Sequence, residues 1–241
     1  MCSPREAGVM TRTAAPHVDE ADLIWQQCLF AFEDPMVDAA FGGLVRTHLD
    51  ETSWVDVVPG WLRGADLVFA ELVARLQWEQ REVTMVHRRL PEPRLTAWWS
   101  PSSGGPEPLP VLDDARMALT RQYARPFDSI GFNLYRDGRD SVAWHADRER
   151  YEHEDPVVAI ISTGTPRVFH LRPKSGVTGA SRSFRLGQGD LLVMGGACQH
   201  DYEHAVPKSA VVDGPRLSIV FRHHLSGGWV SDDAQTVRYS D

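Results

Sequence analysis

The sequence predicts an α+β fold whose core is a double-stranded β-helix, or jelly roll, with helices from the N-terminal half packed outside it. Two stretches between residues 64 and 126 have the apolar spacing of amphipathic helices. After residue 128 the chain changes to short runs rich in valine, isoleucine and aromatic residues, separated by turn residues. Helices followed by many short antiparallel strands are typical of a double-sheet barrel with helices on its outside.

Length and composition favour one domain. The chain has 241 residues, of which 42% are hydrophobic, and this is enough for one sizeable core. Residues 1–18 are polar, small and proline-containing, and we expect a mobile N-terminal tail there. We therefore predict a single domain over residues 19–241, with the jelly-roll core at about residues 128–224.

The cysteines and the hydropathy indicate a cytoplasmic protein with no membrane segment. Cys2, Cys28 and Cys198 are an odd number without CxxC spacing, so neither a disulfide framework nor a zinc finger is indicated. A reducing compartment fits this usage best, and Cys198 is expected to be a buried, inert thiol. No apolar run approaches the ~18 residues that a membrane span needs.

The charge gives mixed information about a nucleic-acid partner. A net charge of -8 counts mildly against a polyanion, because nucleic-acid binders usually carry a basic surface. Only Lys174 and Lys208 among the 25 basic residues are lysines, and arginine is the better residue for forked contacts to phosphate or carboxylate. A local basic groove therefore remains compatible with the sequence.

The two helices come before the main run of strands. The segment GADLVFAELVARLQW predicts a helix over residues 64–76. The segment LDDARMALTRQYARPF predicts a second helix, with Asp113 or Asp114 near its start and Pro126 closing it. Between them RLTAWW reads as a short aromatic strand, and the serine, glycine and proline of residues 100–110 predict an exposed loop.

Strand parity divides the first strand after residue 128 into two faces. In SIGFNLY, Ile130, Phe132 and Leu134 point to one side and predict a core face. Asn133 and Tyr135 point to the other side, and an amide beside a phenol is typical of a pocket lining. The Asp-Gly pair that follows is a strong hairpin signal, so SVAWHAD should return alongside.

The last strand, PRLSIVFR, divides in the same way. Its apolar face holds Leu217, Ile219 and Phe221. Arg216 and Arg222 lie on the opposite face, and an inward arginine without an anionic partner would cost several kcal/mol. Either a carboxylate or a bound dianion pairs with them, or the two arginines reach solvent at the strand ends; parity alone leaves both open.

Two residue types that bind iron, histidine and aspartate, occur in and between these strands. His145 and Asp147 share one face of the returning strand, and the later segment QHDYEHAVP adds His200 and His204. Two histidines and one carboxylate form the facial triad that holds Fe(II) and leaves three positions open. A His-x-Asp pair is common by chance and alone is weak evidence for a metal site. The second histidine and the inward arginines make the metal site a more specific prediction.

Several of these motifs together resemble a known family. The segments EPRLTAWW, NLYRDGRDSVAWHADRE, QHDYEHAVPK and PRLSIVFR resemble the AlkB family of Fe(II)/2-oxoglutarate dioxygenases, in the branch that repairs alkylated DNA and RNA. The resemblance covers roughly residues 53–224, with the motifs in the expected order. It implies the jelly-roll fold and the use of Fe(II), 2-oxoglutarate and O2.

The resemblance assigns roles to the polar residues of the strands. It implies that His145, Asp147 and His204 bind iron, with His204 preferred over His200 because it directly precedes AVP. The residues that it implies for 2-oxoglutarate are Asn133, Tyr135, Arg216, Ser218 and Arg222. Arg216 matches the arginine for the distal carboxylate, and Arg222, counted among the catalytic residues, matches the one near the chelating end. Ser218 stands where many members have asparagine, so one hydrogen bond to the cosubstrate is either lost or replaced by the serine hydroxyl.

The implied reaction is oxidative demethylation. An N-methyl group of a base such as 1-methyladenine or 3-methylcytosine is hydroxylated and leaves as formaldehyde, while 2-oxoglutarate becomes succinate. The base must be single-stranded or flipped out of its stack. Glu149 matches the acidic residue that contacts the exocyclic amino edge, and Trp98 and Trp99 are candidate stacking surfaces, although one of them buried in the core is an equally good interpretation. We expect a monomer.

Two other functions remain open. The acidic net charge would suit a 2-oxoglutarate oxygenase that acts on a protein side chain or a small molecule. A binding module that keeps the barrel without catalysis is the third possibility, against which the complete triad and arginine pair argue. We expect the exposed basic residues His87, Arg88 and Arg89 to form a solvated patch.

Overall fold

The computed structural model describes residues 33–85, 88–101, 107–147, 155–212 and 214–223. The predicted tail over residues 1–18 lies outside these ranges, as do His87, Glu149 and His224. The sheets and helices of the structure lie within the described residues.

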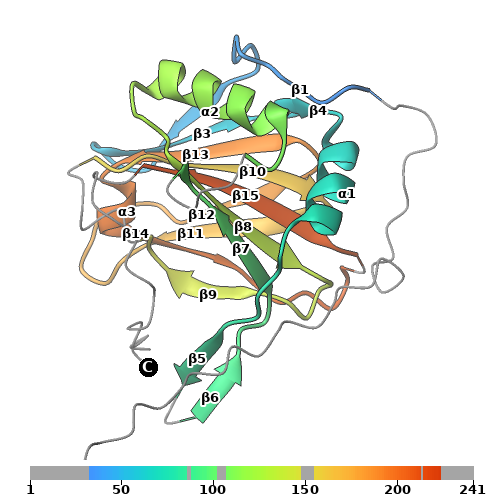
Figure 1. Cartoon of the computed structure of the whole chain (residues 1–241). Coiled ribbons are helices and arrows are strands. Elements are labelled where there is room, and N and C mark those ends of the chain that lie inside the picture. The colour runs from blue at the N-terminus through green and yellow to red at the C-terminus, as the bar shows by residue number, and fades with distance from the viewer. Residues whose placement is uncertain (1–32, 86–87, 102–106, 148–154, 213, 224–241) are drawn as a thin grey trace, which may run out of the picture.

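Two antiparallel sheets face each other and form the body of the molecule (Figure 1). The larger sheet has seven strands in the order β2-β3-β13-β10-β15-β8-β7. Their bounds are β2 Val45–His48, β3 Ser53–Val58, β7 Leu95–Trp99, β8 Ser129–Tyr135, β10 Val158–Gly164, β13 Asp190–Gly196 and β15 Arg216–Arg222. The smaller sheet has four strands in the order β12-β11-β14-β9. Their bounds are β9 Val142–His145, β11 Arg167–Pro173, β12 Arg182–Leu186 and β14 Tyr202–Val206. This double-sheet arrangement confirms the predicted α+β jelly-roll fold.

Helices and two short strand pairs complete the structure. The helices are α1 Ala65–Arg75, α2 Pro110–Tyr123 and the short α3 Cys198–Asp201. The strand pairs are β1 Met36–Val37 with β4 Leu62–Arg63, and β5 Glu82–Met85 with β6 Arg88–Pro91. In Figure 1 the β5–β6 pair extends away from the body, whereas α1 and α2 lie against the larger sheet. No helix in the described part of the chain is both long and apolar enough to cross a membrane.

The core has two layers, one on each side of the larger sheet. Phe132, Ile219 and Phe221 pack toward the helices, where they meet Leu72 of α1 and Leu119 of α2. A second cluster fills the space between the sheets and contains these buried residues: Tyr135, Val158, Phe169, Leu192 and Val220. The alternation predicted for the first and last core strands is thereby confirmed, because successive side chains of β8 and β15 enter different layers.

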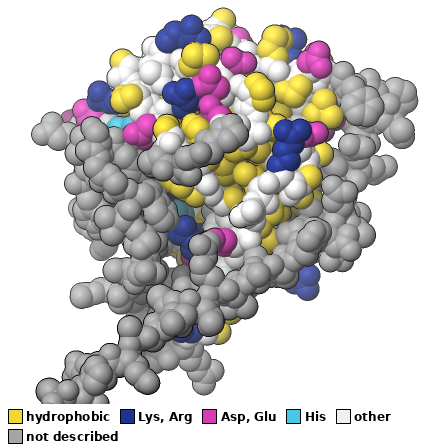
Figure 2. Space-filling view, viewed as in Figure 1, with side chains coloured by type: hydrophobic (Ala, Val, Ile, Leu, Met, Phe, Trp, Pro, Cys, Tyr) yellow, Lys and Arg dark blue, Asp and Glu magenta, His cyan; other side chains and the backbone are white. Residues whose placement is uncertain are grey.

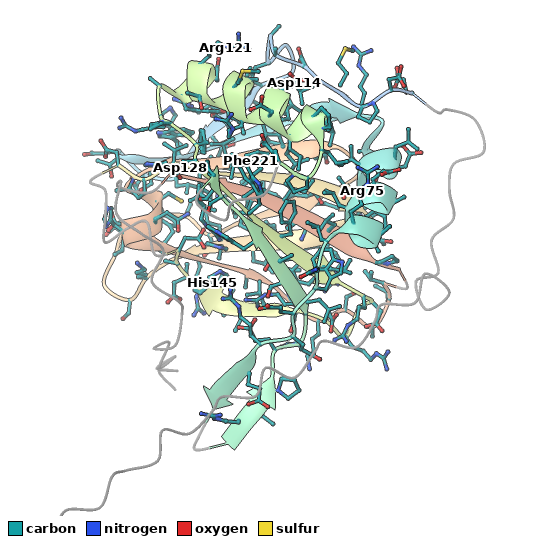
Figure 3. The ribbon with its side chains drawn as sticks, viewed as in Figure 1. Arg75, Asp114, Arg121, Asp128, His145 and Phe221 are labelled. Carbon is teal, nitrogen blue, oxygen red and sulfur yellow. The ribbon has the colours of Figure 1, made fainter. Side chains whose placement is uncertain are left out.

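The surface over the helix side is mixed. In Figure 2 hydrophobic side chains gather between α1 and α2, over the larger sheet, and charged side chains lie around them. Figure 3 shows Asp114 and Arg121 on the outer surface of α2, far from His145 on β9. His145 of β9 therefore lies at the other end of the molecule from α2.

Several details differ from the sequence prediction. The expected hairpin between SIGFNLY and SVAWHAD is wrong, because SVAWHAD forms β9 of the smaller sheet and pairs with β14, whereas β8 pairs with β7 and β15. The second helix begins at Pro110, because proline fits the first turn of a helix, and Asp113 lies in that first turn as predicted. The helix ends before the predicted Pro126, where Ala124 adopts a left-handed backbone with φ 51°. Strands β2 and β3, which precede the predicted core, join the larger sheet. The polar segment around His204 forms strand β14, which the sequence pattern did not indicate.

Candidate metal centre

Three potential metal ligands converge at the edge where β9 meets β14. His145 ends β9, Asp147 follows two residues later, and His204 lies opposite His145 in the register of β14. Their ligand atoms all lie within 4.8 Å of one another. His145 Nε2 is 3.9 Å from Asp147 Oδ1, and His204 Nε2 is 3.8 Å from Asp147 Oδ2. Among the described residues no other group of histidines, cysteines and carboxylates has this geometry, and His200, partly exposed in α3, is not part of it.

The environment keeps these groups in the protonation state that a divalent metal requires. Burial and the neighbouring His145 lower the pKa of His204 to about 3. Burial also lowers the pKa of His145, although Asp147 partly opposes it. Burial alone would raise the pKa of Asp147, but Arg222 and the two histidines outweigh it and hold that pKa below its usual range. At neutral pH the site therefore presents two neutral imidazoles and one carboxylate.

Neighbouring groups hold two of the three potential ligands, His145 and Asp147. His145 Nδ1 lies 2.9 Å from the carbonyl oxygen of Ala143, a hydrogen bond that leaves Nε2 as the ligand atom. The backbone N–H of Asp147 donates to Gln199 Oε1 at 2.9 Å, and Arg222 Nη2 donates to Asp147 Oδ1 at 3.0 Å. Such surrounding hydrogen bonds fix ligand orientation and commonly change metal affinity 10- to 100-fold.

Arg216 is a buried cation with free donors. Its side chain is 1% exposed, and its Nε donates to Ser162 Oγ at 2.9 Å. Nη1 and Nη2 are buried without a well-formed hydrogen bond among the described residues, and the nearby Tyr135 phenol partly offsets the effect of burial on the pKa of Arg216. Burial lowers the pKa of Arg216 to about 10, which leaves it protonated at neutral pH. Two unsatisfied donors on a buried cation are unfavourable unless an anion binds them, so this site fits a carboxylate ligand.

The two predicted inward arginines therefore have different partners. Arg222 pairs with Asp147 of the triad, and its guanidinium lies 5.8 Å from the ring centre of Trp98. Arg216 has no carboxylate within ion-pair distance among the described residues and lies 5.4 Å from the ring centre of Tyr135. Arg216 therefore has donors available for a bound anion.

The other predicted cosubstrate residues lie on the same inner face of the larger sheet. Ser218 and Asn133 are register partners across β15 and β8, as are Arg216 and Tyr135. Ser218 is 5% exposed, and Tyr135 is 3% exposed. The structure thus brings these four side chains to one strip that faces the smaller sheet.

The predicted base-contacting residues are placed differently from one another. Trp98 lies beside Arg222 and over Gly131, where an added Cβ would come within 3.2 Å of Trp98 Cζ3 and 2.8 Å of Arg222 Nη1. A larger residue at this position would have to displace the Arg222 guanidinium and shift the Trp98 ring. Trp99 points to the opposite side of β7 and packs against the helix-side core. Glu149 is outside the described residues.

Three contacts around the site could not be read from the sequence. Gln199 is 1% exposed and holds the Asp147 backbone, and Ser162 holds Arg216. Arg94, just before β7, donates from Nε to Asn133 Oδ1 at 3.1 Å. None of the three stands in a pattern that indicates its partner, because each partner is distant in the sequence.

Arg167 is a further buried arginine that sequence reasoning missed. It is 2% exposed and donates to the backbone carbonyl oxygens of Asp137, Asp140 and Pro207. It thereby ties the turn after β8 to the end of β14, and it lies 5.7 Å from the ring centre of Tyr135.

Comparison with known proteins agrees with this geometry. Residues 99–222 match the model of the 2OG-Fe(II) oxygenase superfamily. The chain is 35% identical over 228 residues to the alpha-ketoglutarate-dependent dioxygenase alkB homolog 3 of Mus musculus, covering 82% of this chain and 80% of that protein. It is 33% identical over 200 residues to alkB homolog 3 of Homo sapiens, and this match covers 75% of this chain and 70% of the human protein. It is 29% identical over 189 residues to the DNA oxidative demethylase ALKBH2 of Arabidopsis thaliana, and this match covers 64% of this chain and 60% of that protein.

The matched region contains all three potential metal ligands and Arg216. The donor set of the site, two neutral imidazoles and a carboxylate, is also the set that suits Fe(II) in this superfamily. The chain belongs to the 2OG-Fe(II) oxygenase superfamily and is an AlkB-type dioxygenase that uses Fe(II), 2-oxoglutarate and O2.

Proposed function

We propose that this dioxygenase removes N-methyl groups from bases of DNA or RNA, of the 1-methyladenine and 3-methylcytosine type, and releases formaldehyde while 2-oxoglutarate becomes succinate. The observation that supports cosubstrate binding is the buried Arg216, whose free donors lie on β15, the same strand that carries Arg222, the partner of Asp147 in the metal site. The substrate half is supported by the relatives, one of which is named a DNA oxidative demethylase.

The iron ligands in this proposal are His145, Asp147 and His204. The two histidine Nε2 atoms and the Asp147 carboxylate are close enough to bind one ion. The pKa shifts of His204 and Asp147 favour a neutral imidazole and an ionised carboxylate, the states that bind a metal. Three ligands on one side of the ion leave the other side for cosubstrate and O2. Arg222 holds Asp147 Oδ1 and so fixes the carboxylate that the metal requires.

The cosubstrate is proposed to bind between Arg216 and the metal. Arg216 Nη1 and Nη2 would bind its distal carboxylate as a fork, the geometry in which arginine pairs best with carboxylates. Tyr135, Asn133 and Ser218 supply a phenol, an amide and a hydroxyl along the same strip. Arg222, which the resemblance places near the chelating end, acts in this structure through Asp147.

When bound, Fe(II) with 2-oxoglutarate and O2 supplies the oxidising chemistry. The protein's part is to orient the reactants and to exclude water. Trp98 covers Gly131 and Arg222 beside the metal site, where its ring is a candidate surface for a flipped or single-stranded base. Trp99 and Glu149 remain sequence-based predictions for substrate contact.

We further propose one catalytic domain over residues 19–241 that acts as a cytoplasmic monomer. The cysteine usage and the absence of a long apolar run in the sequence support the location. A second substrate class is favoured by the net charge of -8: an oxygenase of the same chemistry could act on a protein side chain or small molecule.

The test is to supply Fe(II) and 2-oxoglutarate together with methylated oligonucleotides or with a peptide pool. The oligonucleotides carry 1-methyladenine or 3-methylcytosine in single- or double-stranded DNA or RNA. We expect each oligonucleotide that is a substrate to lose 14 mass units per methyl, about the mass of one CH2, with equimolar formaldehyde. If peptides are oxidised and the oligonucleotides are unchanged, the substrate is a protein and not a nucleic acid. No turnover of 2-oxoglutarate, and no rise in the thermal midpoint with metal and 2-oxoglutarate, would favour a binding module.

A further inference from the structure

Arg94 is held between a carboxylate on its own turn and an amide on the neighbouring strand. Its Nη2 lies 3.2 Å from Glu92 Oε2, and its Nε donates to Asn133 Oδ1 at 3.1 Å. The Arg94 and Glu92 side chains are 17% and 13% exposed. The guanidinium is therefore fixed from two sides in a mostly buried position.

The turn that carries Arg94 is itself fixed by hydrogen bonds. The N–H of Arg94 donates to the carbonyl oxygen of Glu92 at 2.8 Å, and Gln80 Nε2 donates to the same oxygen at 2.9 Å. The N–H of Ser141 donates to the carbonyl oxygen of Pro93 at 2.7 Å, which ties the turn to the start of β9. Arg94 thus approaches Asn133 from a preorganised backbone.

The contact decides which end of the Asn133 amide is free. An asparagine side chain has an oxygen that accepts and an NH2 group that donates hydrogen bonds. Arg94 donates to Oδ1, so the NH2 group is the end left for other partners. The carboxylates and the keto oxygen of 2-oxoglutarate only accept hydrogen bonds, and a flipped amide would turn its oxygen toward an anion.

We infer that Arg94 is a positioning residue that fixes the amide of Asn133 as a hydrogen-bond donor to 2-oxoglutarate. The inference rests on the proposed role of Asn133 in cosubstrate binding and extends it to a residue outside the strip. Arg94 acts through Asn133, so its contribution should vanish when the amide is removed.

A binding measurement without turnover tests this. 2-Oxoglutarate is titrated calorimetrically into protein loaded with Mn(II) in place of Fe(II), without O2. We expect Arg94→Met and Asn133→Ala each to weaken 2-oxoglutarate binding roughly tenfold, the loss of about one hydrogen bond. The double variant should bind 2-oxoglutarate no more weakly than Asn133→Ala. If Arg94 acts only through Asn133, the losses of binding free energy from the two substitutions do not add. Arg89→Met is the matched control, since Arg89 is 76% exposed and lies 3.9 Å from Glu82.

The outcomes separate this inference from the proposed function. Wild-type affinity in Arg94→Met, or additive losses in the double variant, would overturn the inference while Asn133 keeps its role. Wild-type affinity in Asn133→Ala would overturn both. Arg94→Lys keeps the charge without the Nε donor, and we expect it to lose affinity as Arg94→Met does. If Arg94→Lys binds 2-oxoglutarate as tightly as the wild type, Arg94 acts through its charge and does not orient the Asn133 amide. Unchanged Mn(II) affinity and thermal midpoints check that each variant is folded.

Discussion

Replacing Arg216 with methionine should make the ligand-free protein more stable and its cosubstrate binding much weaker. Burial lowers the pKa of Arg216 to about 10 from an ordinary 12.5, so the folded state holds this charge at a cost of about 3 kcal/mol. Methionine removes that cost and keeps most of the side chain's volume. It also removes the hydrogen bond to Ser162, worth about 1 kcal/mol. We expect a net gain of about 1–2 kcal/mol in the free energy of unfolding without ligand.

Binding should change in the opposite direction. Two charge-assisted hydrogen bonds to a carboxylate are worth about 1.5–3 kcal/mol each, so Arg216→Met should weaken 2-oxoglutarate binding by about 100-fold or more. Urea unfolding at pH 7 gives the stability, and calorimetric titration with Mn(II) gives the affinity. Arg185→Met, a change at an exposed arginine of β12, is the control for both. A variant that binds 2-oxoglutarate as the wild type does, or that is less stable without it, would refute this reasoning.

Two further predictions concern the support of the metal ligands and the pH dependence of folding. Gln199→Leu removes the acceptor for the Asp147 backbone and should weaken Mn(II) binding about 10- to 100-fold, whereas His200→Ala in the same helix should leave it unchanged. Equal metal affinity in the two variants would contradict the orienting role of Gln199. Burial, partly offset by Arg116, raises the pKa of Glu107 to about 7, so the protonated carboxyl favours the folded state. The free energy of unfolding should therefore fall by up to about 3 kcal/mol as pH rises from about 4.5 to about 7, relative to Glu107→Gln measured in urea over the same range. Parallel pH profiles for the two proteins would show that Glu107 is not responsible.

Strand parity predicted much of the site, because alternation depends on the backbone alone. The side chains of β8 and β15 were assigned to their correct faces from the period of two, which placed Arg216 and Asn133 opposite the helix-side core. The same argument put His145 and Asp147 on one side. Parity could not decide which group pairs with each arginine. In the structure Arg222 pairs with Asp147, whereas Arg216 has no such partner.

The elements that the sequence did not indicate have weak local signals. Strand β2 has mostly exposed side chains, so it lacks the apolar alternation of a half-buried strand. Strand β14 lies in a segment rich in charged and polar residues, and it forms because it pairs with β11 and β9. Gln199 and Arg94 meet partners 52 and 39 residues away in the chain. Such contacts depend on the assembled sheets and not on any local pattern.

The most direct test of the account is formaldehyde release from single-stranded DNA containing 3-methylcytosine, with Fe(II) and 2-oxoglutarate, by the wild type and by single alanine variants of the triad. We predict formaldehyde and succinate in equal amounts from the wild type and from His200→Ala, and neither product from His145→Ala, Asp147→Ala or His204→Ala. Circular dichroism checks that these variants remain folded. Succinate without formaldehyde from the wild type, or formaldehyde from any of the three triad variants, would contradict the account.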